Sequence, residues 1–488
     1  MTARYEAVIG IEIHVQLRTS AKMFCPCGTD IADAAPNSRT CPVCLGMPGT
    51  LPVINRRAVE HVLATGLAIG GEVPPVTRWD RKNYFYPDLP KGYQISQFDL
   101  PLASHGHLAV DTSAGEVVVG IRRAHLEEDT ARLIHAETPD GRRISLVDFN
   151  RAGMPLMEIV TEPDLHTAEA ARRYAEELRL LLLAIGASEA AMENGQMRVE
   201  ANVSLRAVGS DVLGTRVEVK NMNSFRSVER AIDHEIDRQA GLLDAGAAVQ
   251  QETRGWDDSR GVTYLMRSKE DSHDYRYFPE PDLPPLRPEP AWLEAIRATL
   301  PELPAARRAR YRRDLGLSPY DAAVLTAEPA AASLFEGTLA SGPGLKPKAV
   351  ANWVTGESMR LLKPEVETAA GHGAVIEPAQ LARLVALVEA GELSGTNAKQ
   401  VLQAHARDGA AVDSLVERMG LRQINDEAAL AALVDAVIAA HPGPVAELRA
   451  GKAQVLGFLV GQVMAASRGQ ANAGAAKALL DRRLAGED

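Results

Sequence analysis

Membrane-spanning segments, an export signal and an excess of basic charge are all missing from this 488-residue sequence. No apolar run approaches the roughly 20 residues that a helix needs to cross a bilayer, and residues 1–6 lack the apolar core of a signal peptide. The 53 Lys and Arg residues against 64 Asp and Glu residues give a net charge of −11. This balance does not indicate a bulk-charge nucleic-acid binder, although it does not exclude a local basic face. We expect a cytoplasmic protein that does not enter a membrane.

Two common catalytic motifs are also missing. The sequence has no Walker A or other Gly-rich phosphate loop, so any nucleotide site is of another type. It has no Gly-x-Ser-x-Gly elbow, and no other nucleophilic catalyst stands out.

Cysteine is scarce, and its few copies are clustered. All four cysteines lie between residues 25 and 44, as Cys25-x-Cys27 and Cys41-x-x-Cys44. This spacing is typical of a tetrahedral Cys₄ zinc site in a reducing compartment. Two disulfides or four unrelated thiols are the alternatives. We predict a structural zinc ion, because four thiolates leave no open position for a substrate.

Residues 5–17 alternate between apolar and polar side chains. The apolar set is Ala7, Ile9, Ile11, Ile13, Val15 and Leu17, and the polar set is Glu12, His14 and Gln16. This period of two predicts a half-buried strand. Glu12 and His14 are separated by about 7 Å along such a strand, so both could reach one metal ion or one polar substrate. Taken alone, the pattern also fits an ordinary strand with one face in solvent.

The same alternation recurs in residues 197–206 and 216–221, and a β-branched run at 117–121 leads into a polar segment at 122–129. These strands repeat Glu with amide and Arg partners on one face, whereas a solvated face usually mixes Lys, Thr and Ser. We therefore predict one curved, mostly antiparallel sheet with a functional concave face.

Several carboxylates fall at strand or strand-end positions, namely Glu12, Glu128, Glu158, Glu200 and Glu218. Two bare carboxylates about 4 Å apart repel by roughly 4 kcal/mol at an effective dielectric constant of 20. A divalent cation removes this repulsion, so the cluster favours Mg²⁺ or a pair of Mg²⁺ ions, and the nearby imidazole would also suit Mn²⁺. Carboxylate-bound metal ions on a sheet suit phosphoryl transfer. Ordinary ion pairs with Arg123, Arg198 and Lys220 are the alternative.

The length predicts two to four domains. Helical patterns cover residues 56–69, 168–185 and 227–243, a Pro-rich passage follows at 278–285, and almost everything after about 290 is helical, with a weaker break at 405–409. We predict an α+β fold: a first domain at 1–290 with a Cys₄ zinc insert at 25–44, a helical domain at 291–408 and a small helical tail at 409–488.

Six motifs resemble the B-subunit family of the glutamyl/aspartyl-tRNA amidotransferases. They are residues 8–17 (VIGIEIHVQL), 80–88 (DRKNYFYPD), 93–97 (YQISQ), 125–129 (HLEED), 158–164 (EIVTEPD) and 274–282 (DYRYFPEPD). The likeness runs from the first strand to the last helices. It implies a cradle domain with a glutamine-synthetase-like antiparallel sheet, a middle helical domain and a YqeY-like tail that binds tRNA.

The resemblance also implies an activity. ATP and Mg²⁺ or Mn²⁺ would phosphorylate the side-chain carboxylate of Glu-tRNA(Gln) or Asp-tRNA(Asn), and ammonia would displace the phosphate to give the amide. A glutaminase A subunit would supply the ammonia, and a C subunit would clamp the heterotrimer. The lack of a glutaminase nucleophile in this chain agrees with a separate source of ammonia.

Carried onto matching positions, the resemblance makes Glu12, His14, Glu128, Glu158 and Glu218 the Mg²⁺ ligands and catalytic residues. Lys82 and Glu200 are implied to contact the cofactor. The remaining acid of the HLEED motif is left out, because neighbouring residues of a continuous strand face opposite ways.

Two other functions compete with this one. A non-catalytic tRNA-binding scaffold would have no need for a carboxylate cluster. A ligase acting on free glutamate would have no need for the long helical C-terminal third. The sequence does not indicate which mischarged tRNA is the substrate.

Overall fold

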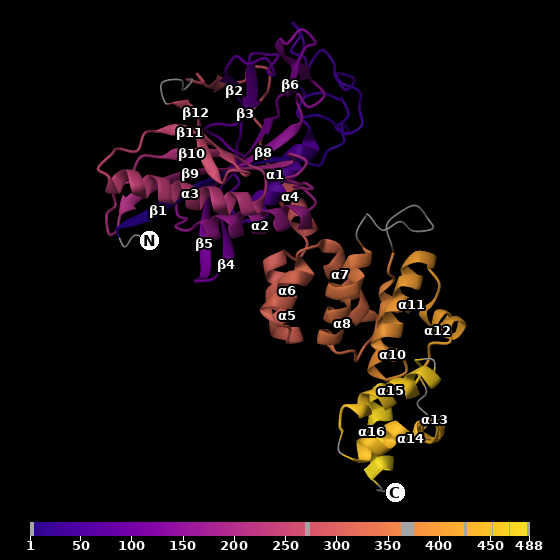
Figure 1. Cartoon of the computed structure of the whole chain (residues 1–488). Coiled ribbons are helices and arrows are strands. Elements are labelled where there is room, and N and C mark those ends of the chain that lie inside the picture. The colour runs from indigo at the N-terminus through magenta and orange to yellow at the C-terminus, as the bar shows by residue number, and fades with distance from the viewer. Residues whose placement is uncertain are drawn as a thin grey trace. The chain divides into compact units, whose positions relative to one another are not determined.

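The computed structural model describes residues 4–268, 274–362, 375–423, 427–450, 452–467 and 469–485. The chain forms two compact units, Met1–Pro304 and Ala305–Asp488. The first unit is built on a large sheet and the second is helical (Figure 1). The three domains expected from the sequence, with boundaries at 290 and 408, stay a prediction.

An eight-stranded sheet forms the centre of the first unit, in the order β12-β11-β10-β9-β1-β8-β5-β4. Its strands are β1 (Tyr5–Gln16), β4 (Ala103–Thr112), β5 (Gly115–Glu128), β8 (Pro155–Thr161), β9 (Met197–Ala207), β10 (Val217–Met222), β11 (Glu252–Asp257) and β12 (Val262–Ser268). Only the β10–β11 pair in this sheet is parallel. All four strand segments expected from the sequence lie in this mostly antiparallel sheet.

The two faces of β1 differ as its alternation predicted. Ile9, Ile13 and Val15 are fully buried on one face, whereas Glu12 and His14 are only partly covered on the other. The neighbouring strands continue both faces, because β1 pairs with β8 on one side and with β9 on the other. The sheet therefore has one apolar face and one polar face.

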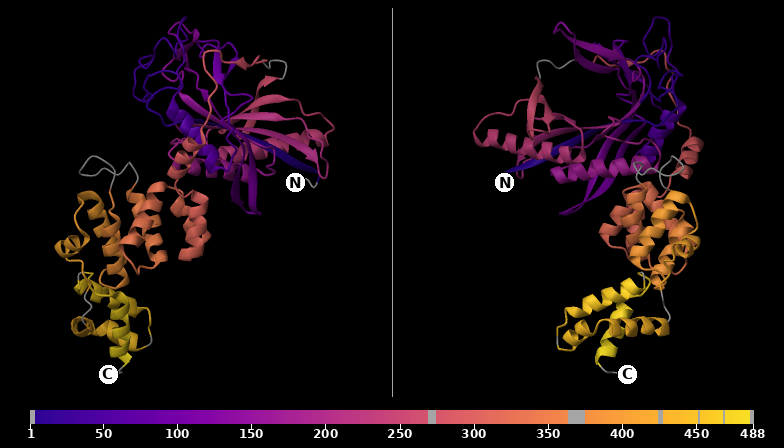
Figure 2. Two further views of the ribbon diagram at one scale, coloured as in Figure 1. Left: turned by 180° about the vertical axis from the view of Figure 1, so that it is seen from behind. Right: turned by 45° about the vertical axis from the view of Figure 1, so that its right-hand side comes forward.

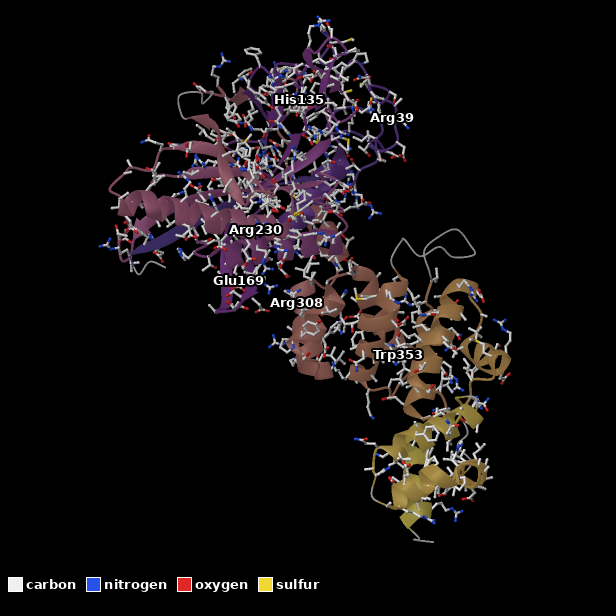
Figure 3. All side chains as sticks on the ribbon, in the orientation of Figure 1. Arg39, His135, Glu169, Arg230, Arg308 and Trp353 are labelled. Carbon is white, nitrogen blue, oxygen red and sulfur yellow. The ribbon has the colours of Figure 1, made fainter. Side chains whose placement is uncertain are left out.

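Three helices cover the apolar face, at the positions that the sequence predicted (Figures 1 and 2). They are α1 (Arg56–Ala68), α2 (Ala168–Ala184) and α3 (Phe225–Asp244). Each begins at a side chain that accepts a backbone N–H: Asn55, Thr167 and Ser224. Near the start of α2, Glu169 (labelled in Figure 3) accepts the backbone N–H of Ser113 from the β4–β5 turn. These three helices do not cover the polar face of the sheet.

Two smaller sheets add to the first unit. One joins β2 (Asp80–Asn83), β3 (Tyr93–Ser96) and β13 (Phe278–Pro279), and the other is the hairpin of β6 (Arg132–Glu137) and β7 (Arg143–Asp148). Arg81 of β2 donates to Glu280, just after β13, at 2.7 and 2.9 Å. This bidentate ion pair joins two segments that are far apart in the sequence.

Helix α4 (Pro290–Thr299) belongs to the first unit. The indole of Trp292 donates to Glu60 of α1 at 3.3 Å, and the guanidinium of Arg56 lies 5.1 Å from the centre of the Trp292 ring. These contacts carry the first unit past residue 290 to Pro304.

The described part of the second unit contains helices and no strands. The helices are α5 (Pro304–Leu315), α6 (Pro319–Thr326), α7 (Pro329–Ser341), α8 (Pro347–Trp353), the π-helix η2 (Val354–Ser358), α9 (Met359–Leu361), α10 (Pro378–Glu389), α11 (Gly395–Asp408), α12 (Val412–Met419), α13 (Glu427–Ala440), α14 (Pro442–Arg449), α15 (Val455–Ala466) and α16 (Ala473–Ala485). They enclose two hydrophobic clusters. The first cluster includes Val412 and Val416, so it continues beyond residue 408.

The described residues include no single helix that is both long and apolar enough to cross a membrane. Glu427–Ala440 and Pro442–Arg449 satisfy those criteria only as a pair, and the chain bends by 94° between them.

Candidate functional site

A cavity of about 470 Å³ lies on the polar face of the large sheet. Strands β1, β5, β8, β9 and β10 provide its floor, and the small sheet and the segment before β13 contribute further lining residues. Six acids line it, namely Glu12, Glu127, Asp129, Glu158, Glu200 and Glu218. The bases are Lys82, Arg123, Arg198 and Lys220, and His14 and His125 are also present.

The strand register brings several of these side chains together. His14 of β1 lies opposite Glu158 of β8, and His125 of β5 lies opposite the same Glu158 from the other side. Glu12 of β1 lies opposite Glu200 of β9. Directly opposed residues have Cβ atoms about 5 Å apart, so pairing alone places these groups within reach of one another.

Five side chains form the centre of the cavity. The Nε2 atom of His14 lies 3.7 Å from Glu12 Oε1 and 3.5 Å from Glu158 Oε2, and it lies 3.7 Å from Glu127 Oε1. Glu12, His14 and Glu158 offer ligand atoms within 4.8 Å of one another, as do His125, Glu127 and Glu158. Both groups therefore have the spacing that a metal ion requires.

Burial and mutual charge perturb these groups strongly. Burial, reinforced by the charge of Glu158, raises the pKa of Glu12 to about 7, and burial also raises the pKa of Glu127. Burial opposes ionisation of Glu158 too, but His125 and His14 hold its pKa well below the usual value. Burial alone would lower the pKa of His14, yet its hydrogen bond with Glu158 and the charges of the surrounding carboxylates together raise it to about 9. Burial lowers the pKa of His125 to about 4. Three crowded carboxylates with imidazole neighbours are a donor set that fits Mg²⁺ or Mn²⁺.

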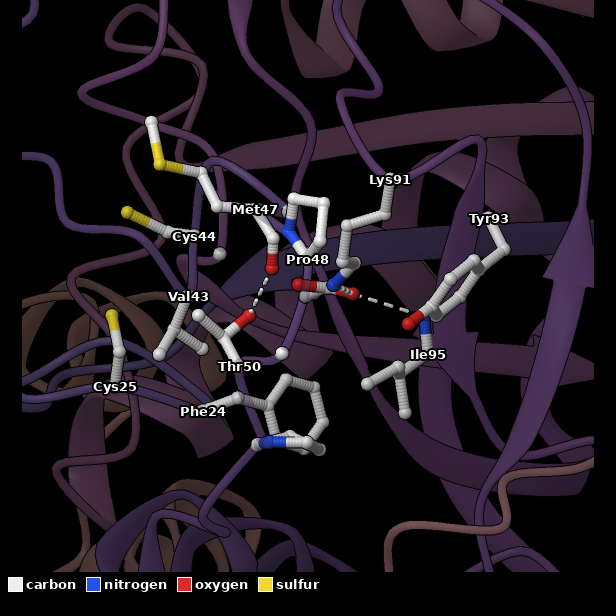
Figure 4. A pocket seen from close by; sticks show the side chains of 15 residues that line it. Phe24, Cys25, Val43, Cys44, Met47, Pro48, Thr50, Lys91, Tyr93 and Ile95 are labelled. Atoms are coloured by element: carbon white, nitrogen blue, oxygen red, sulfur yellow. Dashed lines mark hydrogen bonds and ion pairs between the residues drawn. The ribbon is translucent and has the colours of Figure 1, made fainter.

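Glu128 does not share this cavity, in contrast to the sequence-based expectation. Its carboxylate pairs with the ammonium of Lys91 and accepts the backbone N–H of Ile95 at 3.0 Å. It lines a separate cavity of about 200 Å³ beside the cysteine loop (Figure 4). The physical reason is strand alternation, because consecutive residues of β5 face opposite ways.

Glu127, which the sequence-based set omitted, takes the place expected of its neighbour. A signal for this was present in the sequence. Ala124 and Leu126 are fully buried in the core of the first unit, and they alternate with Arg123, His125 and Glu127, which line the site. The phase of the apolar residues along β5 would have selected Glu127 and His125.

Glu200 and Glu218 line the same cavity but lie outside both metal-competent groups found among the described residues. Lys220 reaches Glu200 Oε2 at 2.6 Å and Glu218 Oε1 at 3.3 Å, and Thr253 donates to Glu218 Oε2 at 2.7 Å. In the structure, therefore, these two acids form ion pairs, which was the alternative to metal binding. Arg198 is held in a similar way, by Asp129 at 3.0 Å.

Lys82 extends into the cavity from β2. Its Nζ lies 5.0 Å from the centre of the Tyr275 ring. Burial would lower the pKa of this amine, but the charges around it, of which Glu127 contributes most, together outweigh burial and raise the pKa. Lys82 is therefore a cation at neutral pH. Its ammonium group could bind an anionic oxygen that enters the cavity.

The four cysteines converge as their spacing predicted. All four thiols are free of disulfides, and their sulfur atoms lie within 4.8 Å of one another. Sulfur atoms around a tetrahedral zinc ion are about 3.8 Å apart, and those of Cys41 and Cys44 are 3.9 Å apart. A hydrogen bond with Cys25 and the nearby Lys22 ammonium help to lower the pKa of Cys44 to about 4. The donor set fits zinc and leaves no open position.

Comparisons with known proteins agree with this division into a sheet-based site and a helical unit. Residues 7–294 match the GatB/GatE catalytic domain, and residues 333–484 match the GatB domain. The chain therefore contains a domain of the GatB/GatE catalytic type followed by a GatB domain.

Relatives from several bacteria match almost the whole chain, and each is named as the B subunit of an aspartyl/glutamyl-tRNA(Asn/Gln) amidotransferase. The Moorella thermoacetica protein is 50% identical over 480 residues, which cover 98% of this chain and 100% of the relative. The Anaeromyxobacter sp. (strain K) protein is 50% identical over 98% of this chain and 99% of its own. The Thermosynechococcus vestitus protein is 48% identical over 98% of this chain and 96% of its own length. The chain belongs to the family of these amidotransferase B subunits.

Proposed function

We propose that this chain carries out the ATP-dependent step in the amidation of mischarged tRNA. Its substrate is the side-chain carboxylate of Glu-tRNA(Gln), of Asp-tRNA(Asn), or of both. The names of relatives that are about half identical over nearly the full length support this substrate class. The observation that carries the chemical step is the convergence of Glu12, His14 and Glu158 on one point in the cavity.

The chemistry explains why such a site is needed. A carboxylate is a poor electrophile, because its oxygen is a poor leaving group. Transfer of the γ-phosphoryl group of ATP to that oxygen gives an acyl phosphate and ADP. Attack by ammonia then forms the C–N bond, breaks the C–O bond and releases phosphate. Exclusion of water from the cavity would protect the acyl phosphate from hydrolysis.

Each residue has a role in this proposal. Glu12, His14 and Glu158 would hold a Mg²⁺ or Mn²⁺ ion, which when bound supplies charge neutralisation for the phosphate oxygens. Lys82 would bind a phosphate oxygen through its ammonium group. Glu127, rather than Glu128, would provide a further carboxylate next to His14.

Glu200 and Glu218 would serve the cofactor less directly. Lys220 forms ion pairs with both of them. We propose that these two acids approach the bound ATP and its metal ion only when Lys220 is drawn towards phosphate.

The ammonia would come from a partner. We propose a heterotrimer in which an A subunit hydrolyses glutamine, so that the complex is a carbon–nitrogen ligase with glutamine as amido donor, and a C subunit clamps the other two. The relatives are named as one component of a larger enzyme, which supports an assembly with other subunits. We also propose that the protein acts in the cytoplasm.

The fold would divide these tasks. We propose that the sheet-based unit is a cradle similar to glutamine synthetase, and that helices α13–α16 form a YqeY-like tail that binds tRNA. Zinc at Cys25, Cys27, Cys41 and Cys44 would have a structural role, because the loop between the two cysteine pairs has no helix or strand of its own.

The two competing functions fit the site less well. A scaffold that only positions tRNA gains nothing from three carboxylates crowded around His14, since their repulsion opposes folding unless a cation is bound. A ligase for free glutamate would not need the helical second unit.

The test uses the purified complex with ATP and ammonium, offered Glu-tRNA(Gln), Asp-tRNA(Asn) or free glutamate in separate reactions. We expect amide formation and ADP release with one or both tRNAs and none with free glutamate. Amide formation from free glutamate would favour the ligase, and tRNA binding without ATP turnover would favour the scaffold.

A further inference from the structure

Four aromatic side chains line the cavity, and the proposed phosphoryl transfer uses none of them. They are Tyr84, Phe98, Tyr275 and Tyr277, and together we call them the aromatic wall. The small sheet carries all four, because Tyr84 follows β2, Phe98 follows β3 and the other two precede β13. The cavity therefore combines carboxylates from the large sheet with aromatic rings from the small one.

The rings of the aromatic wall contact one another in sequence. Phe98 and Tyr277 are stacked nearly parallel, with ring centroids 4.3 Å apart and an interplanar angle of 14°. Tyr275 meets Tyr277 edge-on at 6.1 Å, and it meets Tyr84 edge-on at 5.9 Å. Burial raises the pKa of Tyr277 to about 12, so its ring is uncharged at neutral pH. The wall is therefore a connected, neutral aromatic surface inside a highly charged cavity.

Hydrogen bonds hold the backbone of the wall in place. The backbone N–H of Asn83 donates to the carbonyl of Tyr275 at 2.9 Å, and its side-chain amide donates to the carbonyl of Arg276 at 2.8 Å. Arg276 has a φ of 43°, a left-handed conformation that costs a non-glycine residue energy and that recurs at ligand sites. The carboxylate of Asp80 accepts the backbone N–H of Phe98 at 3.1 Å. The rings are thus fixed before a ligand arrives.

The surroundings of the wall differ from ring to ring. Tyr275 lies beside the charged groups, because Lys82 Nζ is 5.0 Å from the centre of its ring. Phe98 rests on Tyr277 with one face, yet its side chain is 51% exposed although it lines a cavity. A rigid, half-exposed ring of this kind is a platform on which an unpaired nucleobase can stack.

The substrate proposed above carries such a base. In an aminoacyl-tRNA the amino acid is esterified to the ribose of the terminal adenosine, so this unpaired adenine lies several bonds away from the side-chain carboxylate. When the carboxylate reaches the cluster around Glu158, the rest of the tRNA must still extend to solvent. The terminal base therefore lies between that cluster and the solvent, where a half-exposed ring such as Phe98 can meet it.

We propose that Phe98, backed by Tyr277, is a stacking site for the terminal base of the aminoacyl-tRNA. The inference rests on the proposed function, to which it adds a site that holds the 3′ end while the carboxylate is phosphorylated. The adenine of ATP has the same ring chemistry, so the experiment has one arm for each source of the base.

The first measurement uses 2-aminopurine, a fluorescent isomer of adenine that stacking quenches. The complex is titrated with the tRNA that it amidates, carrying 2-aminopurine as its terminal base, and separately with the triphosphate of 2-aminopurine riboside. We expect Phe98→Leu to lose the quenching of the tRNA probe and to leave the triphosphate probe unaffected, because leucine stays apolar but has no π-face. Phe98→Tyr keeps the π-face and should retain the quenching.

The second measurement is steady-state amide formation with ammonium. Phe98→Leu should raise the KM for the mischarged tRNA by about fivefold or more and leave the KM for ATP unchanged. Phe278→Leu is the matched control and should keep both values, because that ring of β13 is similarly exposed, at 44%, and does not line the cavity.

The outcomes separate this site from the proposed function. Wild-type quenching of the tRNA probe and a wild-type KM for tRNA in Phe98→Leu would overturn the stacking site and leave the function intact. An effect of Phe98→Leu on the triphosphate probe and on the KM for ATP alone would overturn the assignment of the base to tRNA. No ATP-dependent amide formation by the wild type would overturn the function as well.

Discussion

Glu127 and Glu128 are consecutive in β5, yet their carboxylates face different cavities. Glu127 Oε1 lies 3.7 Å from His14 in the metal-competent cluster, whereas Glu128 pairs with Lys91 beside the cysteine loop. Two adjacent acids of the same type therefore have separate environments. This arrangement provides a closely matched pair of variants.

Glu127→Gln should weaken Mn²⁺ binding by about tenfold or more, because it removes a charge beside His14. Glu128→Gln should leave Mn²⁺ affinity within a few-fold, since its carboxylate does not reach the cluster. Isothermal titration of both variants with Mn²⁺ compares them directly. A larger loss in Glu128→Gln than in Glu127→Gln would contradict the placement of these residues.

Cation binding should strengthen as the pH rises. Burial and the charge of Glu158 raise the pKa of Glu12 to about 7, so the carboxyl is mostly protonated at pH 6 and mostly ionised at pH 8. A cation needs the ionised form, and this alone predicts about a tenfold gain in Mn²⁺ affinity over that interval. His14, with its pKa raised to about 9, must also lose a proton, so the increase should be steeper still.

The same shift has a consequence for stability in the absence of a cation. The folded-state pKa of Glu12 lies above its ordinary value of 4.5, so the protonated form is favoured by folding. This contribution is present below about pH 4.5 and is lost as the pH rises towards 7. Adding Mn²⁺ should therefore raise the melting temperature more at pH 7.5 than at pH 5.5. An equal effect at both values would count against cation binding at Glu12.

The sequence predicted much of the fold from local patterns. Alternation identified β1, β9 and β10, and helical periodicity identified α1, α2 and α3, but β8, the other partner of β1, has no clear alternation. It did not predict the small sheet in which Arg81 of β2 meets Glu280, because strands that short carry almost no periodic signal and the two segments are far apart in sequence. Lys82 of β2 lines the cavity from that small sheet.

The candidate site could be predicted in part. Glu12 and His14 were found because β1 alternates clearly, whereas Glu158 came from the family motif at 158–164. Glu218 also lies in the cavity, but its interaction with Lys220 depends on cross-strand geometry that a single sequence does not contain. The choice between Glu127 and Glu128 depends on which residues of β5 face the core. The buried Leu126 shows that Glu127 faces the other way.

Lys82→Met should raise the KM for ATP by about tenfold or more, because a charge-assisted hydrogen bond contributes about 1.5–3 kcal/mol. The methionine keeps most of the side-chain volume and removes the charge. Arg122→Gln, which alters an exposed cation of β5 paired with Glu162, serves as the matched control and should keep the wild-type KM. Steady-state ATP turnover by the complex measures both, and an unchanged KM in Lys82→Met would remove Lys82 from the phosphate site.

Cys41→Ser should lower the zinc content of the chain from about one ion to well below one and lower the melting temperature of the first unit. The loop from 25 to 44 has no helix or strand of its own, so the metal would add to the hydrogen bonds that join Asn37 and Arg39 to Asp148 and Asn150. Ser38→Ala, in the same loop, should keep its zinc. Metal analysis after dialysis decides the point, and a zinc-free wild type would exclude the Cys₄ site.

We propose above that the cluster around Glu158 activates a tRNA-borne carboxylate with ATP. The most direct measurement compares wild-type and Glu158→Gln complexes in separate half-reactions: glutaminase activity, binding of mischarged tRNA, ATP hydrolysis and amide formation with ammonium. We predict that the variant keeps glutaminase activity and tRNA binding but loses at least about a hundredfold in ATP hydrolysis and amide formation, because Glu158 lies between both histidines. Wild-type rates of ATP hydrolysis and amide formation in the Glu158→Gln complex would contradict the account.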